Sequence, residues 1–116
     1  KNIILWPQVY GTSSILIKSE VLRKFFNQAK PFSWPLLAID IQLLIFCYLK
    51  YRISNIGKGL TIKKIHNNNL GAVYLNIFKK IFWKRRNMQF NYYFSLNKNK
   101  KYSLDYLLTK FINYLI

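Results

Sequence analysis

Apolar residues recur at helical spacing in three segments of the chain and fill a fourth segment almost completely. The three stripes fall on residues 19–26, 70–81 and 104–115, and apolar residues three or four positions apart share one side of a helix. Residues 39–51 are apolar nearly all round, which predicts a helix that is buried on most sides. Ser19 and Ser103 stand at the starts of the first and last stripes, where serine can cap a helix. The pattern therefore predicts four helices.

Three shorter segments are typical of β-strands. Residues 9–17 run from small residues into Ile-Leu-Ile, and residues 52–56 and 60–65 are β-like runs on either side of a Gly-Lys-Gly turn. The composition changes near residue 72. We therefore expect residues 1–72 to form one unit and residues 73–116 to form a basic, aromatic and helical extension.

The charge balance is the most uneven feature of the composition. The 116 residues include nineteen Lys and Arg but only three Asp and Glu, which gives a formal net charge of +16. Such a field attracts phosphate groups, whether in nucleic acid, nucleotide-sugar or anionic lipid. Lys, Asn, Ile, Tyr and Phe are abundant together, which a genome rich in A and T would also produce, so both origins of the charge stay open. Hydrophobic residues make up 52% of the chain, which is enough for a core.

The best candidate for a membrane span is residues 34–49. This run is shorter than the roughly 20 residues that a spanning helix needs, and it contains Asp40 and Gln42. We therefore interpret it as a buried core helix. Cys47 is the single cysteine and lies among aliphatic residues, which predicts a small buried side chain and excludes a disulfide framework within the chain.

Three short sequences match one enzyme family in the same order along the chain. Residues 11–22 carry small residues before an aliphatic run and a helix, residues 38–43 carry Asp40 at a helix start, and residues 60–71 carry His66 before three asparagines and a glycine. On these residues the chain resembles the C-terminal half of a family-two glycosyltransferase with the GT-A fold. The resemblance covers about residues 6–72 and implies an α/β fold.

The resemblance implies an incomplete enzyme. The family's Asp-x-Asp motif, which holds the metal and the nucleotide diphosphate, is absent from the 116 residues. The chain starts with Lys1 rather than Met, so we expect a nucleotide-binding half upstream and no catalysis by these residues alone. The implied reaction is inverting transfer of a sugar from a nucleotide-sugar donor to a glycan or lipid-linked acceptor, with a divalent metal (Mg or Mn) as cofactor.

By the same resemblance, Asp40 is the general base that takes the proton of the acceptor hydroxyl. His66 would approach the metal or the diphosphate with Lys64 as cationic support, and Thr12 and Ser13 would bind sugar hydroxyls. Each residue also has a plain structural reading: a carboxylate at the positive end of a helix, a surface histidine, a solvated lysine and two turn residues. The catalytic reading requires Asp40 and His66 to meet in one pocket.

Two other functions fit the charge. Residues 73–86 are basic and amphipathic, and such a helix can lie on an anionic bilayer; packing on the domain with its lysines in water is the alternative. A basic, non-enzymatic, ribosomal-type protein would bind nucleic acid through its phosphates and stack exposed aromatic rings on bases, but the sequence has no recognised nucleic-acid motif. We expect a cytoplasmic protein, peripheral at the inner face of the membrane if the extension binds lipid.

Overall fold

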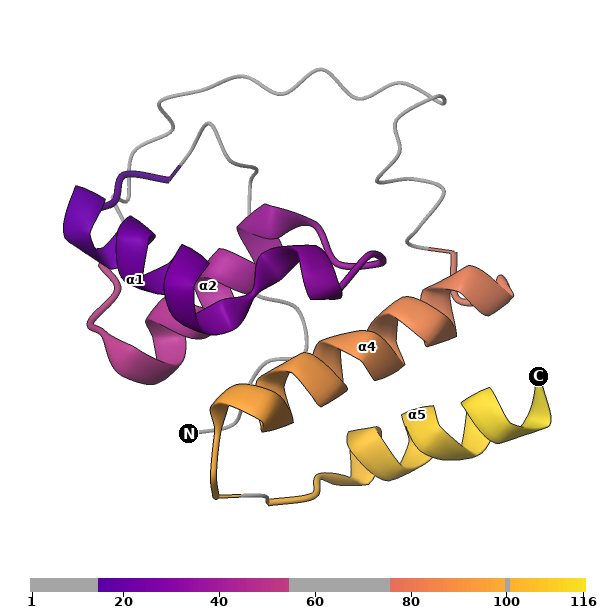
Figure 1. The fold of residues 1–116 in the computed structure, drawn as a ribbon. Coiled ribbons are helices and arrows are strands. Elements are labelled where there is room, and N and C mark those ends of the chain that lie inside the picture. The colour runs from indigo at the N-terminus through magenta and orange to yellow at the C-terminus, as the bar shows by residue number, and fades with distance from the viewer. Residues whose placement is uncertain (1–14, 55–75, 100) are drawn as a thin grey trace.

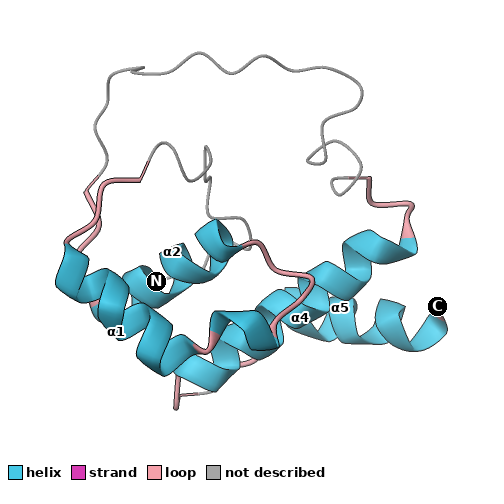
Figure 2. Cartoon of the chain, turned by 45° about the horizontal axis from the view of Figure 1, so that its top comes forward, coloured by secondary structure: helices cyan, strands magenta, loops and turns pink. Residues whose placement is uncertain are grey.

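The fold is known from a computed structural model that describes residues 15–54, 76–99 and 101–116. Within these ranges the chain forms helices and no strand. The helices are α1 (Ser19–Ala29), the 3-10 helix η2 (Pro31–Ser33), α2 (Ile39–Lys50), α4 (Lys80–Leu96) and α5 (Leu104–Leu115). Figure 1 shows α1 and α2 packed on each other, α4 beside them, and α5 running back along α4 in the opposite direction. A second view shows the same pairing of α4 with α5 (Figure 2).

The hydrophobic core of the described residues lies where α1, α2 and α4 meet. Phe25 and Phe46 are fully buried, and their rings pack edge to face with centroids 5.5 Å apart. α1 turns its charged residues outward and buries the opposite side, as an amphipathic helix on a core does. The prediction of a buried helix over residues 39–51 is confirmed by α2. The buried members of the cluster are Val21, Phe25, Ala29, Leu37, Leu43, Ile45, Phe46, Cys47 and Tyr92.

Gln42 ties the core elements together. Its side chain is fully buried, and its Nε2 donates to the carbonyl oxygens of Pro31 at 3.1 Å and Leu37 at 2.9 Å. The hydroxyl of Tyr92 on α4 donates to the backbone oxygen of Gln42 at 3.0 Å. These bonds connect the loop between α1 and α2 to the side chain of Gln42, and connect α2 to α4 through Tyr92. Burial and the neighbouring Cys47 raise the pKa of Tyr92 above its usual range.

The α/β prediction is wrong for the residues that the structure describes. Residues 15–17 and 52–54, which belong to two of the predicted strands, are not strands. Ile15 and Ile17 pack against the core while Leu16 is 96% exposed. The sequence predicts this alternation of buried and exposed side chains, but any extended segment that lies on a core shows the same alternation. A β-strand also needs a neighbouring strand to pair with. The rest of the predicted strands lies outside the described residues.

The position predicted for the third helix is wrong, because only Lys80 and Ile81 belong both to the predicted helix and to α4. Helical spacing suggests residues 70–81, but residues 76–79 form a turn and α4 starts at Lys80. The side-chain oxygen of Asn76 accepts from the backbone N–H of Phe78 at 3.0 Å, and such a local bond competes with helix formation. α4 then continues through the basic cluster at residues 84–86 as far as Leu96. Residues 70–75 lie outside the described residues.

Candidate functional site

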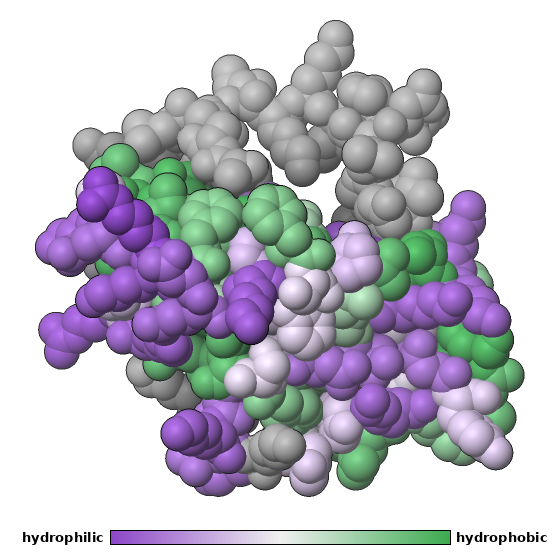
Figure 3. All heavy atoms as spheres, viewed as in Figure 1, coloured by the Kyte–Doolittle hydropathy of each residue, from purple (hydrophilic) through white to green (hydrophobic). Residues whose placement is uncertain are grey.

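α5 presents its apolar side to the outside of the molecule. Leu104 is 84% exposed, Phe111 59% and Leu115 64%, and α5 contributes no residue to the core cluster described above. In Figure 3, hydrophobic spheres reach the surface at the lower right, where α5 and the start of α4 lie. We call this surface the α5 apolar face. Its residues are Leu104, Leu107, Leu108, Phe111, Tyr114 and Leu115.

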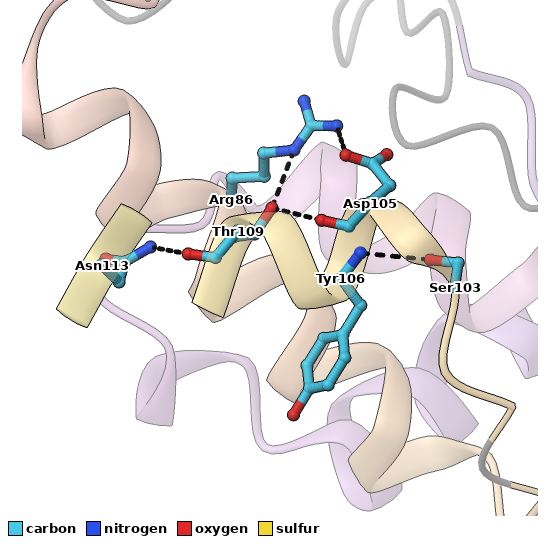
Figure 4. A network of polar contacts seen from close by, with 6 residues as sticks. All are labelled: Arg86, Ser103, Asp105, Tyr106, Thr109 and Asn113. Carbon is cyan, nitrogen blue, oxygen red and sulfur yellow. Dashed lines mark hydrogen bonds and ion pairs between the residues drawn. The ribbon is translucent and has the colours of Figure 1, made fainter. Parts of the chain in front are cut away.

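The polar side of α5 is the side that packs on α4. Thr109 is fully buried, and its hydroxyl accepts from Arg86 Nε at 3.2 Å and donates to the backbone oxygen of Asp105 at 2.8 Å. The guanidinium of Arg86 also forms an ion pair with the Asp105 carboxylate. Asn113 donates to the backbone oxygen of Trp83 at 2.9 Å. Figure 4 shows Arg86 reaching Asp105 and Thr109 from α4, with Tyr106 pointing away from this network.

This polar network decides which way α5 faces. Asp105, Thr109 and Asn113 are spaced four residues apart, so they form one row along the helix. Turning the leucines toward α4 would separate Arg86 from the Asp105 carboxylate and would expose Thr109, which is buried in the observed orientation. The polar row at i, i+4 and i+8 is visible in the sequence and indicates this orientation. The apolar stripe alone does not indicate it.

Lysines accompany the α5 apolar face along its whole length. Lys101 precedes the helix, Lys110 lies on its flank, and Lys80 donates to the backbone oxygen of Ile116 at its end. All three side chains are exposed. Residues 76–116 contain nine Lys and Arg against the single carboxylate of Asp105, which is paired with Arg86. The hairpin of α4 and α5 is therefore both strongly cationic and apolar on its outer side.

The turn before α4 carries two more exposed apolar side chains. Ile77 is 53% exposed and Phe78 is 92% exposed. The indole nitrogen of Trp83 donates to the backbone oxygen of Ile77 at 2.8 Å, which holds this turn against the helix. Asn113 of α5 bonds to the Trp83 backbone, so this turn and the end of α5 belong to one region.

Only one of the predicted site residues lies among the described residues. Asp40 is in the first turn of α2, half-buried, and its Oδ1 accepts from the backbone N–H of Ile41 at 2.8 Å. Thr12, Ser13, Lys64 and His66 lie outside the described residues. The meeting of Asp40 with His66 therefore stays a prediction, as do the roles of the other three residues.

The described residues bear on two further expectations, a bound metal and a core helix rather than a membrane span over residues 34–49. Among residues 15–54, 76–99 and 101–116, no three His, Cys, Asp or Glu side chains come together in a way that could hold a metal ion. The expected ligand His66 is not among these residues, so the metal stays a prediction. No helix in the same ranges has both the length and the apolar character to cross a bilayer.

Comparisons with family models, curated proteins and solved structures found no match to this chain. Together with the helices and the lack of strands in the described residues, this overturns the assignment to a family-two glycosyltransferase with the GT-A fold. The three short matches are not specific to that family. Small residues, an aspartate in the first turn of a helix and a run of asparagines are also common at turns and helix ends of unrelated proteins. Transfer of a sugar is a separate prediction that the described residues do not test.

Proposed function

We propose that this protein binds the surface of an anionic membrane through the α4–α5 hairpin. The observation that supports the proposal is the outward orientation of the α5 apolar face between exposed lysines. An amphipathic helix of this kind lies in the interface plane with its apolar side among the acyl chains and its cations near the headgroups. The cytoplasmic leaflet carries anionic lipid, which would place the protein at the inner face of the membrane.

Two weak attractions act together in this binding mode. α5 has 12 residues, which corresponds to a helix about 18 Å long, too short to hold the protein on a membrane by apolar burial of one helix side alone. Each lysine near an anionic surface adds about 1 kcal/mol, and stable attachment generally needs both an apolar and a polybasic contribution. Lys80, Lys101 and Lys110 supply the second contribution next to the first.

The chemistry of the exposed face favours lipid over nucleic acid. Four of the six residues of the α5 apolar face are leucines, and an aliphatic side chain has no ring to stack on a base. Phosphates of nucleic acid would satisfy the lysines but leave the leucines in water. Acyl chains and anionic headgroups satisfy both.

A vesicle sedimentation experiment tests the proposal with Phe111→Ser. We expect the unmodified chain to sediment with vesicles of phosphatidylglycerol and phosphatidylcholine, and far less with phosphatidylcholine alone. Fully burying an exposed phenylalanine contributes about 1.5–3 kcal/mol, and Phe111 is 59% exposed, so Phe111→Ser should weaken binding by about fivefold to twentyfold. Raising the salt concentration should weaken binding of both chains, because salt screens the lysines.

Phe32→Ser is the matched control, since Phe32 is 84% exposed in η2, away from α5. It should leave vesicle binding unchanged. Equal loss in the two variants would mean that binding depends on general hydrophobicity and not on α5. Sub-micromolar, salt-dependent binding to mixed oligonucleotides without binding to anionic vesicles would instead support the nucleic-acid alternative and remove this proposal.

A further inference from the structure

A hollow of about 300 Å³ lies where α4 turns into α5. Its wall consists of Asn91, Phe94 and Ser95 from α4 with Tyr102 and Tyr106 from the other arm of the hairpin. Most ligand sites in proteins occupy 300–1,000 Å³ and combine aromatic walls with a few polar groups. The volume is at the lower end of this range and the hollow is largely open to solvent, which suits one small ring that keeps one side exposed.

The aromatic rings of the hollow support one another. Tyr102 stacks on Tyr106 with centroids 5.1 Å apart and planes 23° apart, and Phe94 meets Tyr106 edge-on at 5.0 Å. Because the two tyrosines already contact each other, there is no slot between them for a flat base. Tyr102 is 59% exposed, so it is the ring most available to a ligand in the hollow.

Polar and cationic groups surround the same rings. Lys110 Nζ lies 5.6 Å from the centroid of the Tyr106 ring and 3.4 Å from Asn91 Oδ1. Asn91, Ser95 and the tyrosine hydroxyls can each donate and accept hydrogen bonds. A ring that bears several hydroxyls and a negative charge matches this set, because it has an apolar C–H face for Tyr102, hydroxyls for the polar groups and an anion for Lys110.

We propose that this hollow binds a phosphorylated sugar or polyol ring, as found in the headgroup of an anionic lipid such as phosphatidylinositol. The lipid source rests on the proposed membrane binding. Recognition of the ring does not, because it depends on Tyr102 in the hollow and on Lys110 beside the hollow rather than on the leucines of the α5 apolar face. The hairpin would then hold the bilayer with one side of α5 and read a headgroup beside it.

NMR titration of the ¹⁵N-labelled full chain with inositol 1-phosphate tests the ring site directly. The largest shift changes should fall on Asn91, Ser95, Tyr102 and Lys110. Tyr102→Ala should weaken binding by about tenfold, the usual effect of removing a ring on which a ligand stacks, and Phe32→Ala should have no effect. Inositol, which lacks the phosphate, and glycerol 3-phosphate, which lacks the ring, should each bind more weakly than inositol 1-phosphate.

Three results would overturn this inference. The first is the absence of shift changes at these residues with inositol 1-phosphate at tens of millimolar. The second is equal affinity for inorganic phosphate, which would show a charge effect without ring recognition. The third is tighter binding of adenosine monophosphate at the same residues, which would make the site one for a nucleotide.

Vesicles separate this inference from the proposed function. At equal anionic charge, vesicles with phosphatidylinositol should bind the chain several-fold better than vesicles with phosphatidylglycerol. Tyr102→Ala should remove this preference but keep the binding to phosphatidylglycerol, whereas Phe111→Ser should weaken binding to both. Binding to both lipids without preference would overturn the headgroup inference and leave the membrane proposal standing.

Discussion

α1 and α5 are amphipathic helices of similar length that use their two sides in opposite ways. α1 buries Val21, Phe25 and Ala29 against α2 and turns its charges to water. α5 buries Thr109 against α4 and turns its leucines to water. The comparison teaches that an apolar stripe establishes where a helix has two sides, but the polar residues opposite the stripe decide which side meets the rest of the protein.

Substitution of one phenylalanine in each helix tests this contrast between α1 and α5 most directly. Phe25→Ala removes a fully buried ring that packs on Phe46, and such cavities cost about 3–5 kcal/mol of unfolding free energy. Phe111→Ser removes a ring that is 59% exposed and should change the unfolding free energy by about 0.5 kcal/mol or less. Urea unfolding of both variants measures the difference.

Similar losses in the two variants would show that α5 packs its apolar side inward in solution. In that case the outward orientation, and with it the membrane proposal, would fail. Phe32→Ala, on an 84% exposed ring outside α5, gives the baseline for loss of an exposed aromatic residue.

The polar interface of α5 can be weakened through its ion pair. Asp105→Asn leaves Arg86 without its carboxylate, and hydrogen bonds to charged groups contribute about 1.5–3 kcal/mol. We expect the free energy of local unfolding of α5 to fall by about 2 kcal/mol, with little change in the other helices, because α5 packs mainly on α4. Hydrogen exchange should therefore accelerate in residues 104–115 more than in α1 and α2.

Glu20→Gln is the matched control, since Glu20 is an exposed carboxylate in the first turn of α1. It should leave exchange in α5 unchanged. Uniform acceleration in all helices after Asp105→Asn would mean that α5 unfolds together with the core, and the contrast between the two regions would disappear.

The smallest expected effect concerns pH and belongs to the α1–α2 side. Burial raises the pKa of the Cys47 thiol, and burial together with Cys47 raises the pKa of Tyr92. Both groups stay neutral in the fold but ionise in the unfolded chain, where their ordinary pKa values are 9.0 and 10.0. Their contribution to the unfolding free energy is therefore fully present below pH 9, and it is lost as the pH rises from there through the raised pKa values of the folded protein.

We expect the unfolding free energy to fall by about 1 kcal/mol between pH 8 and pH 10. Thermal unfolding of the unmodified chain and of Cys47→Ala at the two pH values measures this loss, which should be smaller in the variant. An equal loss in both chains would assign the pH dependence to groups other than Cys47.

Several elements could be predicted from the sequence because their cause is local. α1 and α2 lie on the segments predicted for them, but Ser19 lies inside α1 and does not cap it, because the N-cap is Lys18 without a side-chain hydrogen bond. The serine cap of α5 is present, with Ser103 Oγ accepting from Tyr106 N–H at 3.2 Å. The start of α4 could not be predicted, because the Asn76 bond to Phe78 stops the apolar spacing from continuing as a helix. The predicted strands failed because strand formation depends on a neighbour that lies elsewhere in the chain.

The candidate site shows the same limit. The sequence displays every residue of the α5 apolar face, the lysines around it and the excess of positive charge. It does not show that Arg86, which is 19 positions away from Asp105, meets that carboxylate across the hairpin. It also does not show that Tyr102 and Tyr106 close one wall of a hollow with Phe94.

Sequence by itself determined where α1, α2 and α5 lie, how many charges the chain carries and that α5 has an apolar and a polar side, but it did not place most of α4. These properties depend on spacing and composition, which act within a few residues. Only the tertiary structure decided that α5 turns its polar side to α4. That orientation leaves a row of leucines exposed and pairs Asp105 with the guanidinium of Arg86, which belongs to another helix, α4.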